Sequence, residues 1–306
     1  MRSKRKPSMD CRLFTDFFTA GARVFLDAAL DLALAEDGAD LTSQGIFPST
    51  ARACALITAK ETSLVAGLPL IPLIMERCVL SPAAWQWRAL VAEGELATPG
   101  RDLVRIEGSA RGLLKAERVM LNFLSHLSGI ANLTRRYVKA LEGTGTKLLD
   151  TRKTLPGLRW PDKYAVLVGG GHNHRRDLSE MLMLKDNHID AAGSIRDAVA
   201  MLRGVYGAGC PPIEVECRDL AELREALDSG VERVMLDNMD IPALAAALPL
   251  IPPRVEAEVS GGVTLENIRA LALASPRRPD FISVGRITHS APAADFSMHI
   301  SKKKFP

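Results

Sequence analysis

The part of the sequence beyond Gly143 alternates short apolar segments with helix-like segments, and this alternation constrains the fold more than any other feature. Strands that alternate with helices form parallel sheets with crossover helices. No GxGxxG sequence follows a strand, which argues against a dinucleotide-binding doubly wound sheet. The pattern therefore predicts an α/β fold of the barrel type, either complete or incomplete, with strands at 147–150, 181–185, 213–217, 233–237, 255–260 and 281–285.

The first part of the chain, from about residue 14 to 108, has a different pattern that predicts an α+β module. A helix is expected over 24–35, and it is followed by strand-like segments at 53–58, 63–67, 94–97 and 103–107. A long helix is then predicted over 113–141, interrupted near Gly129, because its apolar residues recur at intervals of three and four. Later in the chain, Asp219 and Glu222 indicate a helix start and Gly230 its end.

Bulk properties exclude several classes of protein. The 306 residues carry a net charge of +3, too small to indicate a nucleic-acid partner, and the basic run 2–6 is interpreted as a solvated tail. No apolar run approaches the roughly 20 residues of a membrane span. The five cysteines form no CxxC pair, which favours a reducing compartment, and we expect a cytoplasmic protein.

Charged residues and glycines stand at the end of every predicted strand. In an α/β barrel, the carboxyl ends of the strands face one mouth, and that mouth holds the active site. Six such endings together favour a site over packing. In chain order they are Thr151-Arg152-Lys153, Lys185-Asp186-Asn187-His188, Glu216, Asp237-Asn238, Ser260-Gly261-Gly262 and Gly285-Arg286.

The charge of this region predicts an anionic ligand. Three acids (Asp162, Asp177 and Glu180) oppose a larger group of cations between residues 152 and 185. Arginine forks bind carboxylates and phosphates at two points, and glycine turns expose backbone amides to a phosphate. A helix expected to begin near Thr264 would add its positive end. The cations are Arg152, Lys153, Arg159, Lys163, Arg175, Arg176 and Lys185.

Two acids in the same mouth, Glu216 and Asp237, are predicted to bind magnesium or ribose hydroxyls, or to stabilise a developing positive charge. Glu214 shares a strand face with Glu216 by alternation, so one of the two could instead face solvent. His174 is interpreted as a hydrogen-bond donor to the anion. A metal site built from His172, His174 and His188 is the less favoured alternative, because no fourth ligand lies at a convincing spacing.

At these residues the sequence resembles the quinolinate phosphoribosyltransferases. The resemblance runs from about residue 29 to 298, with its motifs in the family's order. The chain departs from the family pattern at Val119 and Arg286. The most specific matching segments are Asp150-Thr151-Arg152-Lys153-Thr154-Leu155-Pro156-Gly157, Asn173-His174-Arg175, Lys185-Asp186-Asn187-His188, Leu236-Asp237-Asn238 and Ser260-Gly261-Gly262.

The resemblance implies a fold, a reaction and an assembly. The fold is an incomplete, seven-stranded type of α/β barrel over 118–289, with an N-terminal α/β sandwich domain over 1–117 that the C-terminal segment 290–306 joins. The reaction joins quinolinate to phosphoribosyl pyrophosphate with Mg²⁺, giving nicotinate mononucleotide, pyrophosphate and carbon dioxide. The assembly is a homodimer in which Arg118 reaches the partner's barrel mouth.

The resemblance also implies residue roles. Arg152, Arg175 and Lys185, with His174 beside them, would bind quinolinate, and Lys153 would contact phosphoribosyl pyrophosphate. Glu216 and Asp237 would hold the ribose hydroxyls and magnesium. Thr151 belongs to the same substrate-binding segment. The 5′-phosphate would be bound by Ser260, Gly261, Gly262, Gly285 and Arg286.

Three other functions are compatible with parts of the pattern. A Schiff-base aldolase would use Lys185 as nucleophile but leaves the arginines and the Ser-Gly-Gly turn without a purpose. A pyrophosphorylase for another heterocycle conflicts with the Asn-His-Arg and Lys-Asp-Asn-His motifs. A non-catalytic anion-binding protein would gain nothing from Glu216 and Asp237 in its mouth.

Overall fold

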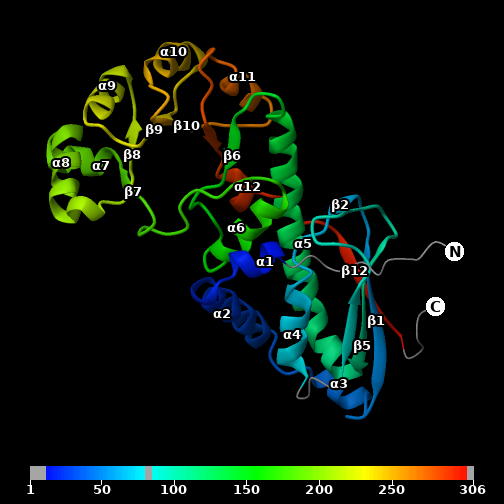
Figure 1. Cartoon of the computed structure of the whole chain (residues 1–306). Coiled ribbons are helices and arrows are strands. Elements are labelled where there is room, and N and C mark those ends of the chain that lie inside the picture. The colour runs from blue at the N-terminus through cyan, green and yellow to red at the C-terminus, as the bar shows by residue number, and fades with distance from the viewer. Residues whose placement is uncertain (1–11, 80–84, 302–306) are drawn as a thin grey trace. The chain divides into compact units, whose positions relative to one another are not determined.

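The computed structural model describes residues 12–79 and 85–301, and within these the chain forms two compact units (Figure 1). The first unit contains the chain up to Leu133, the segment Leu155–Gly169 and the chain from Ser290 onward. The second unit contains Thr134–Thr154 and Gly170–His289. The basic run 2–6 and Cys11 lie outside the described residues.

This division differs from the expected one in two ways. The boundary falls inside a long helix, α5 (Ala110–Ala140), and not at residue 117. The segment Leu155–Gly169, expected in the barrel, packs with the first unit because its helix α6 (Arg159–Val168) contributes Tyr164 to an aromatic cluster there. The rings of Phe14 and Phe18 each lie 5.5 Å from that of Tyr164.

The first unit is built on an antiparallel sheet of four strands. The C-terminal strand pairs with β1, so Cys54 lies opposite Ser301 and Ala59 opposite Phe296. A separate pair of short strands, β2 (Ser63–Leu64) and β4 (Leu96–Ala97), lies outside this sheet. The order of the main sheet is β12 (Phe296–Ser301), β1 (Arg52–Ala59), β5 (Asp102–Ser109) and β3 (Gln86–Ala89).

The predicted interruption of the long helix near Gly129 is wrong, because α5 is continuous from Ala110 to Ala140. Gly129 has a different purpose. A Cβ atom at this position would lie 2.1 Å from the carbonyl oxygen of Pro292, so only glycine allows the C-terminal segment to pass against the helix. The other helices of this unit are α1 (Arg12–Phe17), α2 (Ala20–Glu36), α3 (Leu41–Ile46) and α4 (Leu70–Cys78).

The second unit contains a parallel sheet of six strands, one at each predicted position. An isolated parallel bridge between Leu149 and His172 adds one further pairing beside β6. No ladder between β6 and β7 closes the barrel among the described residues. The order is β6 (Lys147–Leu149), β11 (Phe281–Ser283), β10 (Glu256–Ser260), β9 (Arg233–Asp237), β8 (Ile213–Cys217) and β7 (Leu182–Leu184).

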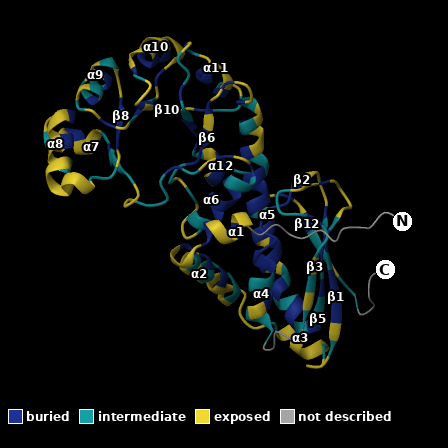
Figure 2. Ribbon diagram, in the orientation of Figure 1, coloured by how far each residue is buried: buried dark blue, intermediate teal, exposed yellow. Residues whose placement is uncertain are grey.

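Helices follow the strands and lie on the outer side of the curved sheet in Figure 1, with their buried faces toward it in Figure 2. Asp219 caps one of them by accepting hydrogen bonds from the backbone of Ala221 and Glu222, as predicted. The helix expected near Thr264 begins only at Ile268, since residues 265–267 form a turn. These helices are α7 (Asp186–Ala192), α8 (Ile195–Tyr206), α9 (Leu220–Asp228), α10 (Ile241–Ala247) and α11 (Ile268–Ala272), and a short helix, α12 (Arg286–His289), follows β11.

The helices that the structure describes differ in length and polarity from membrane-spanning helices. Each of them is too short or too polar to cross a lipid bilayer.

Candidate active site

The carboxyl ends of the parallel strands surround a cavity of about 450 Å³ in the second unit. Backbone amides, cations and acids converge there because every strand of a parallel sheet ends at the same edge. Its lining consists of Thr151, Arg152, Lys153, His174, Arg175, Met183, Lys185, Glu216, Met235, Asp237, Asn238, Glu258, Ser260, Gly261, Gly262 and Ser283.

All but three of the predicted site residues line this cavity. Gly285 lies directly beside it, because a Cβ atom there would be 3.1 Å from Cδ of Lys153. Arg286 is exposed at the start of α12, and Arg118 is exposed on the part of α5 that belongs to the first unit. Arg159 and Lys163 were also expected among the cations near the anion, but the structure places both on α6 in the first unit.

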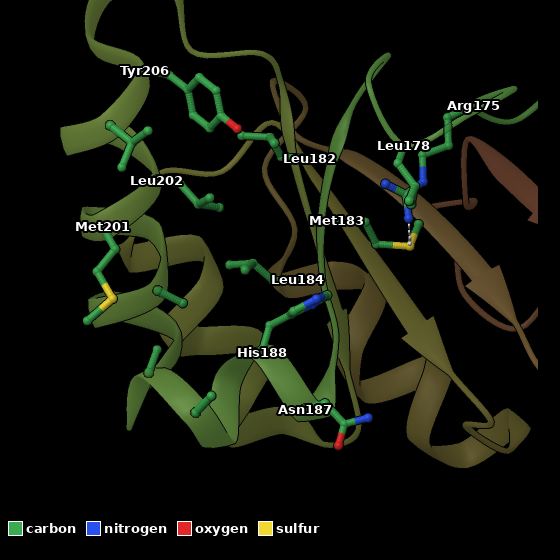
Figure 3. A pocket seen from close by; sticks show the side chains of 14 residues that line it. Arg175, Leu178, Leu182, Met183, Leu184, Asn187, His188, Met201, Leu202 and Tyr206 are labelled. Atoms are coloured by element: carbon green, nitrogen blue, oxygen red, sulfur yellow. Dashed lines mark hydrogen bonds between the residues drawn. The ribbon is translucent and has the colours of Figure 1, made fainter.

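The guanidinium of Arg175 makes two contacts with neighbouring methionines. One of its terminal nitrogens, Nη1, donates to the carbonyl oxygen of Met181 at 2.9 Å, and Nη2 lies 3.5 Å from Sδ of Met183 (Figure 3). Burial lowers the pKa of Arg175, and the neighbouring charge of Arg152 lowers it further. An anion bound between these two arginines would relieve their repulsion.

Lys185 and Glu216 form an ion pair at the mouth, with Nζ 2.7 Å from Oε2. Burial raises the pKa of Asp237, and the negative charge of Glu216 raises it further. Two carboxylates that repel each other in one cavity form an oxygen donor set of the kind that suits Mg²⁺. Glu216 and Asp237 therefore offer ligands that fit a magnesium ion, and Lys185 compensates part of their charge.

The Ser260-Gly261-Gly262 turn follows β10 and packs tightly against the turn after β9. The backbone N–H of Asn238 donates to the carbonyl oxygen of Ser260 at 2.9 Å. Gly261 has φ +89°, and a Cβ atom there would lie 2.7 Å from the backbone nitrogen of Asn238. Asn238 itself has φ +54°, the one positive value of a residue other than glycine among those described. The close packing of the two turns thus requires positive φ values at Asn238 and Gly261 and leaves no room for a side chain at Gly261.

Three buried polar residues, His174, Glu214 and Glu258, lie together at the cavity, and sequence reasoning found only part of this group. Glu214 does not face solvent, since both it and Glu258 are fully buried. Nε2 of His174 lies 3.1 Å from Oε2 of Glu214 and 3.5 Å from Oε2 of Glu258. Glu258 lies two positions before Ser260 on β10, as Glu214 lies two positions before Glu216 on β8. Side chains two positions apart on a strand point to the same face, so this alternation could have predicted that Glu258 belongs to the site.

The pKa values of the two buried acids reflect this environment. Burial raises the pKa of Glu214 to about 7. Burial, followed by the charge of Glu214, raises the pKa of Glu258 to about 8. Two carboxylates in such proximity resist simultaneous ionisation.

The alternative metal site of three histidines is not formed. Within the described residues, His174 groups with Glu214 and Glu258 instead. His188 belongs to the first turn of α7, where its Nδ1 accepts from the backbone nitrogen of Lys185 at 3.1 Å. His172 is exposed next to β6.

An open α/β barrel whose mouth combines clustered cations, two acids and a glycine turn defines an enzyme for anionic, phosphate-bearing substrates. Family profiles described as quinolinate phosphoribosyl transferase match this chain over residues 40–128 (N-terminal domain) and 130–299 (C-terminal domain). The chain belongs to the quinolinate phosphoribosyltransferase family.

Individual relatives agree with this assignment. A probable carboxylating nicotinate-nucleotide pyrophosphorylase of Synechocystis is 41% identical over 283 residues, which cover 90% of this chain and 93% of the relative. The solved structure of NadC from Streptococcus pyogenes is 40% identical and superposes with a TM-score of 0.83, covering 90% of this chain and 96% of that one. The nicotinate-nucleotide pyrophosphorylase from Francisella tularensis is 32% identical with a TM-score of 0.84, covering 93% and 99%.

Proposed function

We propose that quinolinate and phosphoribosyl pyrophosphate meet in the cavity at the carboxyl ends of the parallel strands. The reaction of this chain is that of its family, the decarboxylating transfer of a phosphoribosyl group to quinolinate in de novo NAD biosynthesis. The observation that carries the assignment to this cavity is the convergence of Arg152, Arg175, Glu216 and Asp237 with the Ser260–Gly262 turn.

The cations of the cavity suit a pyridine with two adjacent carboxylates. Arg152 and Arg175 would hold the carboxylates, because a guanidinium offers paired N–H donors in the plane of the anion. Lys185 would add a compact positive charge after exchanging its contact with Glu216 for one with the substrate. Bound in this way, the pyridine nitrogen points toward the acids and the glycine turn.

The acids and the glycine turn suit the second substrate. Ser260, Gly261 and Gly262 present backbone amides to the 5′-phosphate, and Lys153 lines the same cavity close to Gly285. The pyridine nitrogen attacks the anomeric carbon while its bond to the pyrophosphate oxygen breaks, and pyrophosphate leaves with that electron pair. Glu216 and Asp237 stabilise the positive charge that develops on the ribose.

Decarboxylation then follows from the charge of the product ring. The carboxylate beside the nitrogen leaves as carbon dioxide, its bonding electrons remain on the ring carbon next to the cationic nitrogen, and that carbon takes a proton from solvent. Arg152 and Arg175 contribute by holding the ring in place, so positioning supplies much of the rate. Mg²⁺ held by Glu216 and Asp237 would supply neutralisation of the leaving pyrophosphate.

Arg118 is proposed to act in a dimer. It is exposed on α5 and lies outside the cavity lining, which is consistent with a role toward a second copy of the chain. We infer a homodimer in which each Arg118 serves the partner's cavity, and a cytoplasmic location.

The primary test measures nicotinate mononucleotide and carbon dioxide formed from quinolinate, phosphoribosyl pyrophosphate and Mg²⁺, with nicotinate in place of quinolinate as control. Product from quinolinate alone is the expected result. Arg175→Ala should then raise the quinolinate KM by well over tenfold, because a hydrogen bond to a charged group contributes about 1.5–3 kcal/mol. An unchanged quinolinate KM would refute the placement of quinolinate beside Arg175.

Subunit mixing tests the role of Arg118. Arg118→Ala and Lys153→Ala are each expected to be inactive alone. In a mixed dimer, one cavity combines an intact Lys153 with an intact Arg118 from the partner, so random 1:1 mixing should restore about one quarter of the wild-type activity. If Arg118 acted on its own barrel, mixing would restore none.

A further inference from the structure

The segment Leu155–Gly169 belongs to the first unit, although the chain on either side of it belongs to the second unit. Lys153, which the proposed function places against phosphoribosyl pyrophosphate, lies two residues before this segment. The contacts that hold the start of the segment therefore limit where the backbone of Lys153 can lie.

The segment starts with a tight turn. The backbone N–H of Leu158 donates to the carbonyl oxygen of Leu155 at 3.1 Å. Pro156 and Gly157 occupy the two central positions, and Gly157 has φ +78°, as in a type II turn. Oδ2 of Asp162 accepts a hydrogen bond from the backbone N–H of Leu155 at 3.3 Å. One carboxylate thus ties the first residue of the turn to helix α6, which follows it.

Asp162 has a partner on another helix. It is fully buried, and a buried carboxylate is unfavourable unless it is paired. Nε2 of His126, on α5, lies 2.7 Å from Oδ1 of Asp162. Burial raises the pKa of Asp162, and the hydrogen bond with His126 acts against that shift. The imidazole therefore favours the charged carboxylate in the position where it accepts from Leu155.

We propose that His126 and Asp162 are positioning residues that hold the turn of residues 155–158, so that Lys153 is presented to phosphoribosyl pyrophosphate. The inference rests on the proposed function, because it concerns one cation of the proposed cavity. It assigns a purpose to an ion pair whose members lie outside the cavity lining and take no part in the chemistry.

The position of the Lys153 ammonium group depends on its backbone. The residue is exposed, and a lysine side chain is a flexible stem. The carbonyl oxygen of Lys153 accepts from Oγ1 of Thr288 at 2.9 Å, and its backbone N–H donates to Oγ1 of Thr151 at 3.0 Å. These contacts hold Lys153 within the second unit, and the contact of Asp162 with Leu155 holds the chain two residues later.

A separate set of contacts holds helix α6. Two residues beyond Asp162, the hydroxyl of Tyr164 donates to Oε1 of Glu93 at 2.8 Å, and its ring packs in the aromatic cluster. Glu93 also accepts from the backbone N–H groups of Gly67 and Leu68. Removal of the His126 contact should therefore release the turn before α6 and leave the helix in place.

Three variants test the proposal by steady-state kinetics with each substrate varied in turn. His126→Leu removes the donor and should raise the phosphoribosyl pyrophosphate KM about fivefold or more, with the quinolinate KM within about twofold of wild type. His126→Gln, whose amide can donate to Asp162, should keep both KM values within about twofold. Asp27→Asn is the matched control, because it removes the charge of another paired carboxylate of the first unit, bonded to Arg23 and Arg77, and should shift neither KM.

Hydrogen exchange observes the turn directly and needs no turnover. The amide of Leu155 should exchange about tenfold faster in His126→Leu than in the wild type, because its acceptor is no longer held in place. The amides of α6 near Tyr164 should keep their protection. His126→Gln and Asp27→Asn should exchange as the wild type does.

A general loss of stability would lower the amount of active enzyme without shifting one KM alone. Equal shifts of both KM values in His126→Leu, an unchanged phosphoribosyl pyrophosphate KM, or unchanged exchange at Leu155 would each overturn the proposal. If His126→Leu does not fold, Asp162→Asn replaces it. This variant keeps the size of the side chain but offers one oxygen in place of two, so it should show the same two effects, and the absence of either would overturn the proposal.

The proposed function can fail separately. Loss of all quinolinate activity in the wild type would reject the proposed function, while the exchange of the Leu155 amide would still decide whether His126 and Asp162 hold the turn.

Discussion

The Ser260-Gly261-Gly262 turn allows two neighbouring glycines to be compared under nearly the same conditions. Both have positive φ, +89° for Gly261 and +59° for Gly262. A Cβ atom at Gly262 would meet nothing within 4 Å. At Gly261 it would lie 2.2 Å from Oδ1 and 2.7 Å from the backbone nitrogen of Asn238, and the backbone cannot move aside as a flexible side chain can.

The two alanine variants should therefore differ by the overlap alone. A left-handed conformation costs an alanine about 1–2 kcal/mol, and this cost is common to Gly261→Ala and Gly262→Ala. Overpacking adds about 1–3 kcal/mol at Gly261 only. The expected loss of stability is thus about 2–5 kcal/mol for Gly261→Ala and about 1–2 kcal/mol for Gly262→Ala.

Calorimetry of the two variants and the wild type measures this difference. In a chain of this size each kcal/mol lowers Tm by about 2–4 °C. The turn also presents amides to the 5′-phosphate in the proposed function, so the phosphoribosyl pyrophosphate KM should rise more in Gly261→Ala, while the quinolinate KM changes less. Equal losses of Tm in the two variants would refute the argument that Asn238 and Gly261 pack in contact.

Two further predictions concern the first unit. Gly129→Ala should destabilise the protein by about 1–3 kcal/mol or more, because its Cβ would overlap Pro292. Gly21→Ala, in a helix with open space around it, should stabilise the protein by about 0.5–1 kcal/mol. If thermal unfolding ranked the two variants in the opposite order, the packing of Gly129 against Pro292 would be contradicted. Burial raises the pKa of Glu93 from 4.5 to about 7, so its contribution to stability is fully present below pH 4.5 and is lost as the pH rises through 7. The free energy of unfolding of wild type minus that of Glu93→Gln should accordingly fall between pH 5 and pH 8 in urea titrations, and a difference that stays constant would show that Glu93 titrates normally.

Most strands of the second unit could be predicted from the sequence because a parallel strand is buried on both faces and forms a short apolar segment, although β8 and β10 carry glutamates between their apolar residues. The same alternation predicted which residues follow each strand, and the parallel arrangement then brings those residues to one edge. Arg152, Lys185 and Asp237 are thus close in space because of a topology that the sequence pattern already implies. The start of α9 could also be predicted from the sequence, because Asp219 has the side chain of a helix N-cap.

Features that depend on contacts between distant segments were decided only by the tertiary structure. Gly129 has the sequence signature of a helix break, yet it allows Pro292 to approach a continuous helix. Arg159 and Lys163 follow the cation motif in sequence, but their helix packs with the first unit, because burial of its apolar face outweighs proximity along the chain.

The roles within the site show the same division. The sequence determines which side chains arrive at the strand ends, since that depends on local pattern. It does not determine whether a histidine faces the ligand or the interior, since this depends on hydrogen-bond partners supplied by other strands. His174 was predicted to donate to the anion; in the structure it lines the cavity, and its Nε2 also lies 3.1 Å from Glu214 on β8 and 3.5 Å from Glu258 on β10, neighbours that the local sequence pattern does not reveal.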